Sequence, residues 1–221
     1  KKIVVSEDPD KTLSNKEFPW LSYRDIEIGM CPVRALRVAY TGELGWELHH
    51  PIEMQNYLLD ILLSSGEEFN LKLVGARAQN WLRQEKSYKA FGSDLGRDAG
   101  PFESKLSRFV DINKNFLGKD ALLKRKTDVS CVTLLIDGPK DIDPWGREAL
   151  YNETEEVMLG RLTSAGYSVH FKRSIGIGYV KSSFSEVGTK LRIKIDDAFW
   201  NAEIVRDSPY DPQNERIIDR A

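Results

Sequence analysis

The feature that most constrains the fold is a series of short β-rich runs in the C-terminal part of the chain. Turn-forming residues separate these runs, and no convincing long amphipathic helix interrupts them. Evenly spaced strands of this kind are typical of a small antiparallel barrel or sandwich. The runs are CVTLLI (131–136), MLGRLTS (158–164), IGIGYV (175–180), KLRIKI (190–195) and FWNAEIV (199–205).

Strand patterns also occur near the N-terminus, in a more irregular context. Residues 6–30 are turn-prone and predict connections around one or two short strands. The alternation in VRALRVAY (33–40) predicts a strand, and WELHH predicts a short second strand after the turn TGELG. On that second strand Glu47 and His49 share one face, opposite the neighbouring tryptophan and leucine. The stretch is therefore expected to form a hairpin-like corner.

Helical spacing of apolar residues predicts helices over 52–63 and about 75–90, and a short helix over 118–126. After these helices the sequence pattern changes to the short β-rich runs described above. We therefore predict an α+β fold, with a mixed domain over 1–127 and a small antiparallel β-barrel over 128–221.

The composition excludes two classes of partner. The 32 basic residues nearly cancel the 34 acidic ones, and a net charge of −2 gives no electrostatic footprint for nucleic acid or an anionic membrane. No apolar run approaches the roughly 18 residues that span a bilayer. Only two cysteines occur, Cys31 and Cys131, which argues against a disulfide framework and favours a reducing compartment. The cytoplasm, or the mitochondrial matrix in a eukaryote, is the expected location.

Standard catalytic and metal-binding motifs are missing from the sequence. The histidines have no metal-ligand spacing with the cysteines, so no metal site is expected. SIGIGYV (174–180) contains a GxG but lacks a third glycine and a following helix, which favours a close-packed strand over a phosphate loop. No P-loop, GxSxG, HExxH or EF-hand pattern is present. We therefore assign no catalytic residue.

The segment AYTGELGWEL (39–48) carries an unusual acid. Glu47 lies between Trp46 and Leu48, where burial of an unpaired carboxylate would be costly. Either the acids of this turn face water, or Tyr40 and Glu47 face a pocket that holds a ligand. The residues alone leave both interpretations open.

Segments that follow this turn, matched in order over about 33–217, together resemble one known family. WLRQEKSYKAFGSDL (81–95) is similar to that family's helix and loop, LRxEKxYRxWGxDL. The family is the folate-binding one that includes the glycine-cleavage aminomethyltransferase (T-protein) and the C-terminal halves of dimethylglycine and sarcosine dehydrogenases. The tryptophan and leucine of GELGWEL resemble the dehydrogenase branch more than free T-protein. Further similar segments are PFESKLSRFVD (101–111), FLGKDAL (116–122), TSAGYSV (163–169), RSIGIGYV (173–180), EVGTKLRIKI (186–195) and SPYDPQNERI (208–217).

The resemblance implies a partial T-protein-type folate-binding domain followed by the family's C-terminal barrel. It implies tetrahydrofolate as the ligand, with Tyr40 as the turn tyrosine and Glu47, rather than Glu43, as the carboxylate that grips the pterin ring. An ionised carboxylate can accept two adjacent pterin N–H groups at once. Leu48 and His49 are expected to line the same stretch.

Three arginines need a separate account. From charge alone, Arg77 and Arg83 on the second predicted helix either pair with acids or are solvated, and solvation is the favoured interpretation. T-protein carries an arginine whose place Gln79 takes here, so the resemblance makes the nearby Arg77 a substitute candidate. The position of Arg108 faces folate in the family but often holds an aromatic residue there. The arginine here would instead attract the glutamyl tail of the ligand.

The resemblance also bears on completeness and activity. The family's catalytic aspartate lies upstream of anything in this chain, so we expect a fragment that is inactive alone, and we leave open whether it counts as an enzyme. FAD is expected only in an upstream domain, if at all. The expected partners are folate and the rest of the folate domain, and an apolar face left open there would favour a homo-oligomer.

Three functions are therefore carried forward. The leading expectation is one-carbon transfer to tetrahydrofolate as part of a dimethylglycine or sarcosine dehydrogenase-like enzyme. The alternatives are a glycine-cleavage aminomethyltransferase and a folate-binding or regulatory homologue without turnover.

Overall fold

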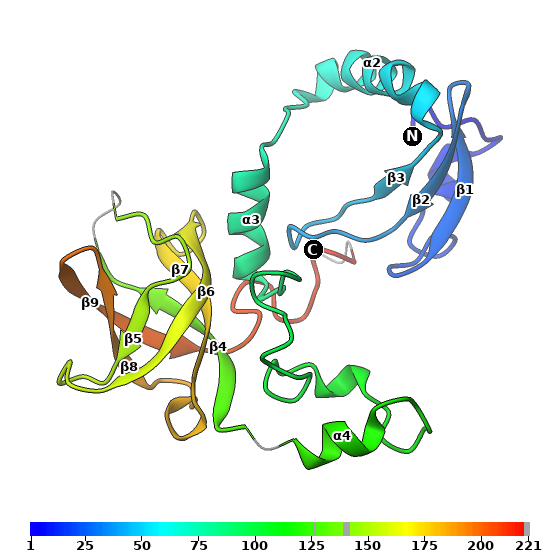
Figure 1. Cartoon of the computed structure of the whole chain (residues 1–221). Helices are drawn as coiled ribbons and strands as arrows, with labels where there is room; N and C mark the ends of the chain where they lie inside the picture. The colour runs from blue at the N-terminus through cyan, green and yellow to red at the C-terminus, as the bar shows by residue number, and fades with distance from the viewer. Residues whose placement is uncertain (126, 139–141, 219–221) are drawn as a thin grey trace. The chain divides into compact units, whose positions relative to one another are not determined.

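The computed structural model divides the chain into two compact units, drawn in Figure 1. The first unit is Lys1–Gln79 with Gln213–Ala221, and the barrel unit is Asn80–Pro212. Residues 80–127 thus share a unit with the barrel. The predicted division between 127 and 128 follows a change in sequence texture rather than contacts, and it stays a prediction. The structure describes residues 1–125, 127–138 and 142–218.

The first unit contains a three-stranded antiparallel sheet. Its strands, in the order β1-β2-β3, are β1 (Tyr23–Ile28), β2 (Cys31–Leu36) and β3 (Glu47–His49). The two predicted strands are confirmed as β2 and β3. A two-residue turn joins β1 to β2, and Gly29 adopts a left-handed φ of +57° there. A Cβ at Gly29 would lie 2.3 Å from the Tyr57 hydroxyl, so glycine is needed for both reasons.

β2 ends four residues before Tyr40, where the predicted strand was expected to continue. The backbone N–H of Arg37 donates to the carbonyl of Ser22 (2.9 Å), and the Arg37 carbonyl accepts from Leu21 (3.1 Å). These bonds hold Arg37 on the β1 side, and the N–H of Val38 donates to the Leu36 carbonyl at 3.0 Å, a three-residue turn that ends the strand.

A helix covers one face of this sheet. The predicted helix over 52–63 is confirmed as α2 (Gln55–Gly66), preceded by the 3₁₀ turn η1 (Ile52–Met54). Its Leu58, Ile61 and Leu62 pack with buried residues of the strands, because apolar residues at this spacing form one stripe of a helix. The core of the unit is Val4, Phe18, Ile28, Cys31, Val33, Ala35 and Leu58. The remaining short elements are α1 (Pro9–Thr12) and η2 (Glu67–Phe69).

The second predicted helix is α3 (Ala76–Glu85), and it ends five residues earlier than expected. Ser87 has a left-handed φ of +53°, the N–H of Ser87 donates to Gln84, and that of Tyr88 donates to Arg83. This pair of bonds is a Schellman-type helix end, which sequence spacing alone does not reveal.

The short helices of the barrel unit lie outside the strands. The predicted third helix is α4 (Lys119–Lys124); its expected last residue, Lys126, lies outside the described residues. The 3₁₀ turns are η3 (Ser107–Phe109) and η4 (Ser182–Phe184).

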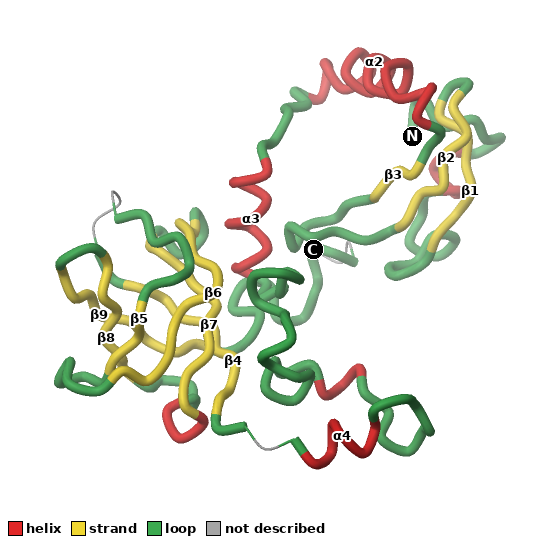
Figure 2. The backbone as a smooth tube through the Cα atoms, viewed as in Figure 1, coloured by secondary structure: helices red, strands yellow, loops and turns green. Residues whose placement is uncertain are grey.

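Among the described residues, six strands of the barrel unit close into an antiparallel barrel (Figure 2). The order is β4-β7-β6-β5-β8-β9, and pairing of β4 with β9 closes it. All five predicted runs are confirmed as strands, whereas the three-residue β5 is too short to show a pattern. The strands are β4 (Val129–Ile136), β5 (Ala149–Tyr151), β6 (Met158–Ser168), β7 (Arg173–Lys181), β8 (Lys190–Ile195) and β9 (Ala198–Val205).

The barrel interior is filled by aliphatic side chains, and close packing explains the GxG of β7. A Cβ at Gly178 would lie 2.5 Å from the Arg161 carbonyl oxygen, and one at Gly176 would lie 3.0 Å from Leu162. The prediction of a close-packed strand is confirmed. The core residues are Val132, Leu134, Ile136, Leu150, Leu159, Leu162, Ala165, Val180, Leu191, Ile193, Ile195, Ala202 and Ile204.

The two cysteines are buried free thiols, Cys31 on β2 and Cys131 on β4. Burial raises the pKa of the Cys131 thiol to about 11, which makes it a poor nucleophile near neutral pH. No helix in the described part of the chain is both long and apolar enough to cross a membrane.

Candidate functional site

The segment between β2 and β3 folds back on itself, and its glycines make this fold possible. We call residues 37–49 the corner segment. Gly42 is buried with a left-handed φ of +84°, a conformation that other residues adopt only with strain. A Cβ at Gly45 would lie 3.1 Å from the Cβ of Ala39, so the two limbs of the segment touch. The glycines of the motif YTGELG are thus required first of all by the backbone conformation of the segment.

The two acids of the corner segment have different surroundings. Glu43 lies in the bend, half-buried, and forms an ion pair with Arg216 at 3.8 Å, in agreement with the interpretation of Glu43 as a turn residue. Glu47 opens β3, and its side chain is 55% exposed. Its carboxylate Oε2 lies 3.6 Å from Nε2 of the His49 imidazole. The Glu47 carboxylate is therefore open to water.

The predicted alternation along β3 is confirmed. Glu47 and His49 are exposed on one face, whereas Leu48 packs against the core of the first unit on the other. In the register with β2, Glu47 lies opposite Leu36 and His49 opposite Arg34, so these four side chains share a face. Glu47 is thus not wedged between apolar neighbours: the strand directs it away from Leu48.

A shallow groove of about 1020 Å³ includes His49 in its lining. Within it, Asp25 and Arg34 form a paired contact, with Arg34 donating to the two carboxylate oxygens at 2.8 and 3.0 Å. The hydrogen bond from Arg34 lowers the pKa of Asp25, and Asp25 raises that of Arg34. The charges of Asp25 and Arg34 therefore compensate each other. The wall also includes Leu36, His50 and Pro51.

The other three predicted residues lie apart from Glu47 in sequence and environment. Tyr40 is half-buried in the corner segment. Arg77 is exposed on the first turn of α3, still within the first unit. Arg108 belongs to the barrel unit, is exposed on η3, and lies 4.7 Å over the ring of Phe109. The first unit therefore contains five of the six predicted ligand residues.

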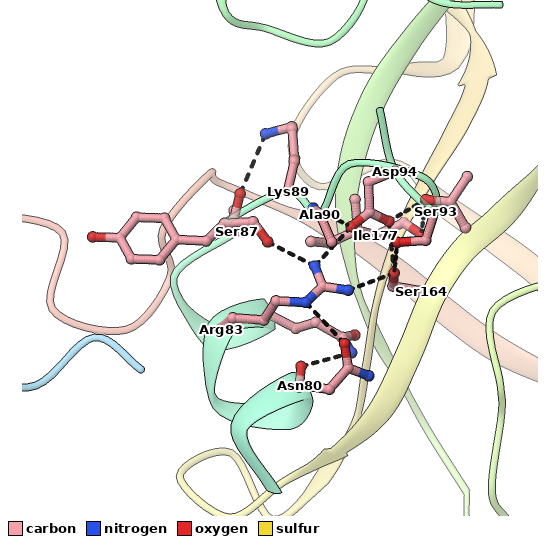
Figure 3. Close-up of polar contacts among 12 residues, drawn as sticks. Asn80, Arg83, Ser87, Lys89, Ala90, Ser93, Asp94, Ser164 and Ile177 are labelled. Carbon is pink, nitrogen blue, oxygen red and sulfur yellow. Dashed lines mark hydrogen bonds and ion pairs between the residues drawn. The ribbon is translucent and has the colours of Figure 1, made fainter. Parts of the chain in front are cut away.

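A buried charged network, which sequence reasoning missed, lies in the barrel unit (Figure 3). Arg83 is 2% exposed and its Nη1 lies 2.7 Å from the Oδ2 of Asp94, whose side chain is 0% exposed. The favoured interpretation of Arg83 as a solvated residue was wrong. Its guanidinium also donates to Asn80 and to Ser164 of β6, so it ties α3 to the barrel. A buried guanidinium requires this satisfaction.

Asp94 accepts hydrogen bonds on both carboxylate oxygens. Arg83 and the backbone N–H of Ala90 donate to Oδ2, and the hydroxyls of Thr163 and Ser164 donate to Oδ1. Four donors leave this carboxylate saturated, so it has no capacity for a ligand. The sequence feature that could have revealed this ion pair is the family-like block 81–95, which contains both Arg83 and Asp94.

Two neighbouring charged residues of that block, Glu85 and Lys86, are also bound to other groups of the protein. Glu85 accepts from the Ser168 hydroxyl and from the backbone N–H of His170. Lys86, with a side chain 0% exposed, donates to the backbone carbonyl of Asp211 and lies 3.5 Å from its carboxylate. These contacts anchor the block to β6 and to the C-terminal segment of the barrel unit, which is an architectural role.

Two tyrosines of the barrel unit, Tyr179 and Tyr88, are half-buried. Tyr179 donates to the backbone carbonyl of Asp94 at 2.8 Å and shares a hydrogen bond with Ser104 at 2.7 Å. Burial raises the pKa of Tyr179 to about 12. Burial also raises the pKa of Tyr88, against the opposing effect of the nearby Arg108 charge. Both phenols stay protonated near neutral pH.

No group of three or more histidine, cysteine, aspartate or glutamate side chains in the described ranges could hold a metal ion. The sites of interest are therefore the open corner segment and the saturated network of the barrel unit. Of these two sites, the corner segment is the one whose carboxylate could accept donors from a ligand.

Comparison with known proteins gives two family matches in chain order. Residues 2–114 match the GCVT N-terminal domain, and residues 130–211 match the glycine cleavage T-protein C-terminal barrel domain. The first match spans the corner segment and the second spans the barrel strands. Both expected parts of the family resemblance are thus confirmed.

Relatives of known name agree with this assignment. Mitochondrial dimethylglycine dehydrogenase of Mus musculus is 36% identical over 92% of this chain, and the match covers 23% of that protein. An aminomethyltransferase of Caldanaerobacter subterraneus is 29% identical over 91% of this chain, and the match covers 54% of it. The chain therefore spans about a quarter of the first relative and about half of the second.

A solved structure supports the fold. The glycine cleavage system aminomethyltransferase T of Bartonella henselae superposes with a TM-score of 0.77 and 22% identity, covering 91% of this chain and 55% of that one. The helix-and-sheet first part and the closed barrel are thus arrangements of the aminomethyltransferase fold. With both domain models matched in order, the chain belongs to the glycine-cleavage T-protein family, which its dimethylglycine dehydrogenase and aminomethyltransferase relatives share.

Proposed function

We propose that this chain takes part in one-carbon transfer to tetrahydrofolate, as in a dimethylglycine or sarcosine dehydrogenase-like enzyme, and that the corner segment is one wall of its folate site. The observation that carries the proposal is the open carboxylate of Glu47. It stands in the family motif, whereas Asp94, Glu85 and Lys86 of the other family-like block are occupied by internal partners.

The chemistry of Glu47 fits a pterin ring. Its two oxygens can accept two adjacent N–H donors, and such charge-assisted paired bonds are about twice as strong as neutral ones. The exposed fraction of 55% leaves room for a planar ligand to approach. When the ligand covers the carboxylate, the lower local dielectric strengthens both bonds.

The remaining predicted residues take supporting roles in this proposal. Tyr40 and His49 would flank the ring, and Leu48 would support the strand from its packed side. Arg77, in the same unit as the corner segment, is the candidate substitute for the T-protein arginine. Arg108 belongs to the barrel unit, so its attraction for the glutamyl tail stays a separate prediction, based on the match between a guanidinium and a carboxylate.

Bound tetrahydrofolate would supply the nitrogen that takes up the one-carbon unit. The residues of this chain would bind and orient it, which converts an encounter of two reactants into a reaction within one site. Exclusion of water once a bound ligand covers Glu47 would protect a reactive one-carbon species.

The dehydrogenase type is favoured over free aminomethyltransferase because the named dehydrogenase relative is the more similar, at 36% against 29% identity. An assay separates the two. Uptake of the one-carbon unit from formaldehyde supports the dehydrogenase type, whereas uptake only from a lipoyl-bound aminomethyl group supports the transferase. For the chain reconstituted with the upstream part of a full folate domain, binding without either reaction supports a regulatory homologue. The 221 residues alone are expected to show neither reaction, and the same assay tests this.

Calorimetric titration of the chain with tetrahydrofolate tests the site itself. We expect Glu47→Gln to weaken binding at least tenfold, about 1.4 kcal/mol, because one charged acceptor pair is lost. Glu43→Gln is the matched control, since Glu43 lies in the same segment but pairs with Arg216, and its affinity should stay within twofold. Equal affinity of wild type and Glu47→Gln would overturn the assignment.

A further inference from the structure

Arg37 is the most deeply buried charge of the corner segment, and no role follows for it from the family motif. Its side chain is 2% exposed, within the first unit. Burial of a guanidinium in an apolar setting is costly unless its donors are satisfied. The chain nonetheless places it at the first residue after β2, where the corner segment begins.

The contacts of Arg37 join the two limbs of the corner segment to the segment that precedes β1. Its Nη1 donates to the carbonyl of the buried Phe18 at 2.5 Å. Its guanidinium carbon lies 5.8 Å from the ring centroid of Trp46, within the range of a cation–π contact. Its backbone bonds to Leu21 and Ser22 fix the start of the segment as well.

Trp46 is the residue before Glu47, and its ring is 37% exposed. A contact that fixes Trp46 also fixes where β3 starts and hence where the Glu47 carboxylate points. The short strand gives little other restraint, because β3 has three residues and, among the described residues, pairs as an edge strand with β2. The closed bend at Gly42 and Gly45 brings the two limbs together but does not by itself orient Trp46.

We infer that Arg37 is a positioning residue for the proposed folate site: through its stack on Trp46 it holds the Glu47 carboxylate in the orientation that accepts the pterin. This inference rests on the proposed function of Glu47. It assigns Arg37 no contact with the ligand, so its effect must pass through Trp46 and Glu47.

The test is a set of tetrahydrofolate titrations on the full chain with the variants Arg37→Met, Arg37→Lys, Trp46→Leu and Glu47→Gln. We expect Arg37→Met and Trp46→Leu to raise Kd about tenfold and Arg37→Lys about threefold, since lysine keeps the charge but not the flat stacking surface. In a Glu47→Gln background, Arg37→Met should change Kd less than twofold, because the group that it positions is gone.

A purely structural role predicts a different pattern. Arg37→Met would then weaken binding by the same factor with or without Glu47, or only in proportion to the unfolded fraction measured by urea denaturation. Trp46→Leu keeps the argument testable if Arg37→Met fails to fold, because Trp46 is partly exposed. If Glu47→Gln binds as tightly as wild type, the proposed function fails; if only Glu47→Gln weakens binding, the inference about Arg37 alone fails.

Discussion

Asp94 and Glu47 are both carboxylates of family-like motifs, yet they have opposite surroundings. Asp94 is 0% exposed and accepts four hydrogen bonds, whereas Glu47 is 55% exposed and lies 3.6 Å from one imidazole. A saturated carboxylate fixes architecture, and an unsaturated one can still accept donors from a ligand. Of these two motif acids, Asp94 therefore holds the fold, whereas Glu47 is open to a ligand.

The largest effect is expected at Asp94. Asp94→Ala leaves the Arg83 guanidinium buried without its counter-charge, and loss of one partner of a buried pair costs about 3–5 kcal/mol. Urea denaturation measures the free energy of unfolding. The control is Asp98→Ala, an exposed aspartate of the same loop, which should change it by less than about 0.5 kcal/mol. A loss of stability below about 1 kcal/mol for Asp94→Ala would show that Asp94 does not hold the fold together.

Lys86 should behave like Asp94, with a smaller cost. Lys86→Met removes the donor to the Asp211 carbonyl and leaves a carboxylate that is 8% exposed, for an expected loss of about 3 kcal/mol. The matched control is Lys190→Met at the exposed start of β8. Equal stability of the two variants in urea would show that this buried ion pair does not anchor the C-terminal segment.

Ionisation of Glu103 is expected to make the stability of the fold depend on pH. Burial acts to raise its pKa, but hydrogen bonds from Thr127 and the backbone, with the Arg125 charge, outweigh it and leave the pKa lowered. A lowered folded-state pKa gives stability that is present above the unfolded value near 4.5 and lost as pH falls through the folded value. Glu103→Gln should thus cost about 1 kcal/mol at pH 7 and flatten the fall in stability below pH 4.5. An acid limb as steep as that of wild type would contradict this.

The smallest change in stability is expected at Glu47. Glu47→Gln alters an exposed side chain with one distant neighbour, so the free energy of unfolding should stay within about 0.5 kcal/mol of wild type. A loss above 1 kcal/mol in urea denaturation would place Glu47 with the architectural acids and weaken its assignment as a ligand residue.

Much of the fold could be predicted because periodicity reports burial directly. Alternation found β2, β-rich runs separated by turns found the five long barrel strands, and helical spacing found α2. The end of α3 at Glu85 could not be predicted, because it depends on a left-handed residue, Ser87, for which the sequence gives no glycine signal. The strand β5 could not be predicted either, because three residues are too few to show an alternation.

The site was only partly predictable for a related reason. The alternation placed Glu47 on a face with His49, as the structure has it. The choice of Glu47 as the ligand carboxylate came from the motif and stays a prediction. The burial of Arg83 was missed because its partners Ser164 and Asp94 come from elements that only the fold brings together, 81 and 11 residues away. Arg37 was missed because arginine is rarely buried, although it continues the alternation of the buried Val33 and Ala35.

Hydrogen exchange with and without tetrahydrofolate tests the central claim most directly, because it reports where a ligand orders the backbone. We predict that ligand-dependent protection is greatest over residues 37–49 and disappears in Glu47→Gln, while residues 81–95 are slow to exchange in both states. Protection confined to 81–95, or equal protection in wild type and Glu47→Gln, would contradict the assignment of the corner segment as the folate site.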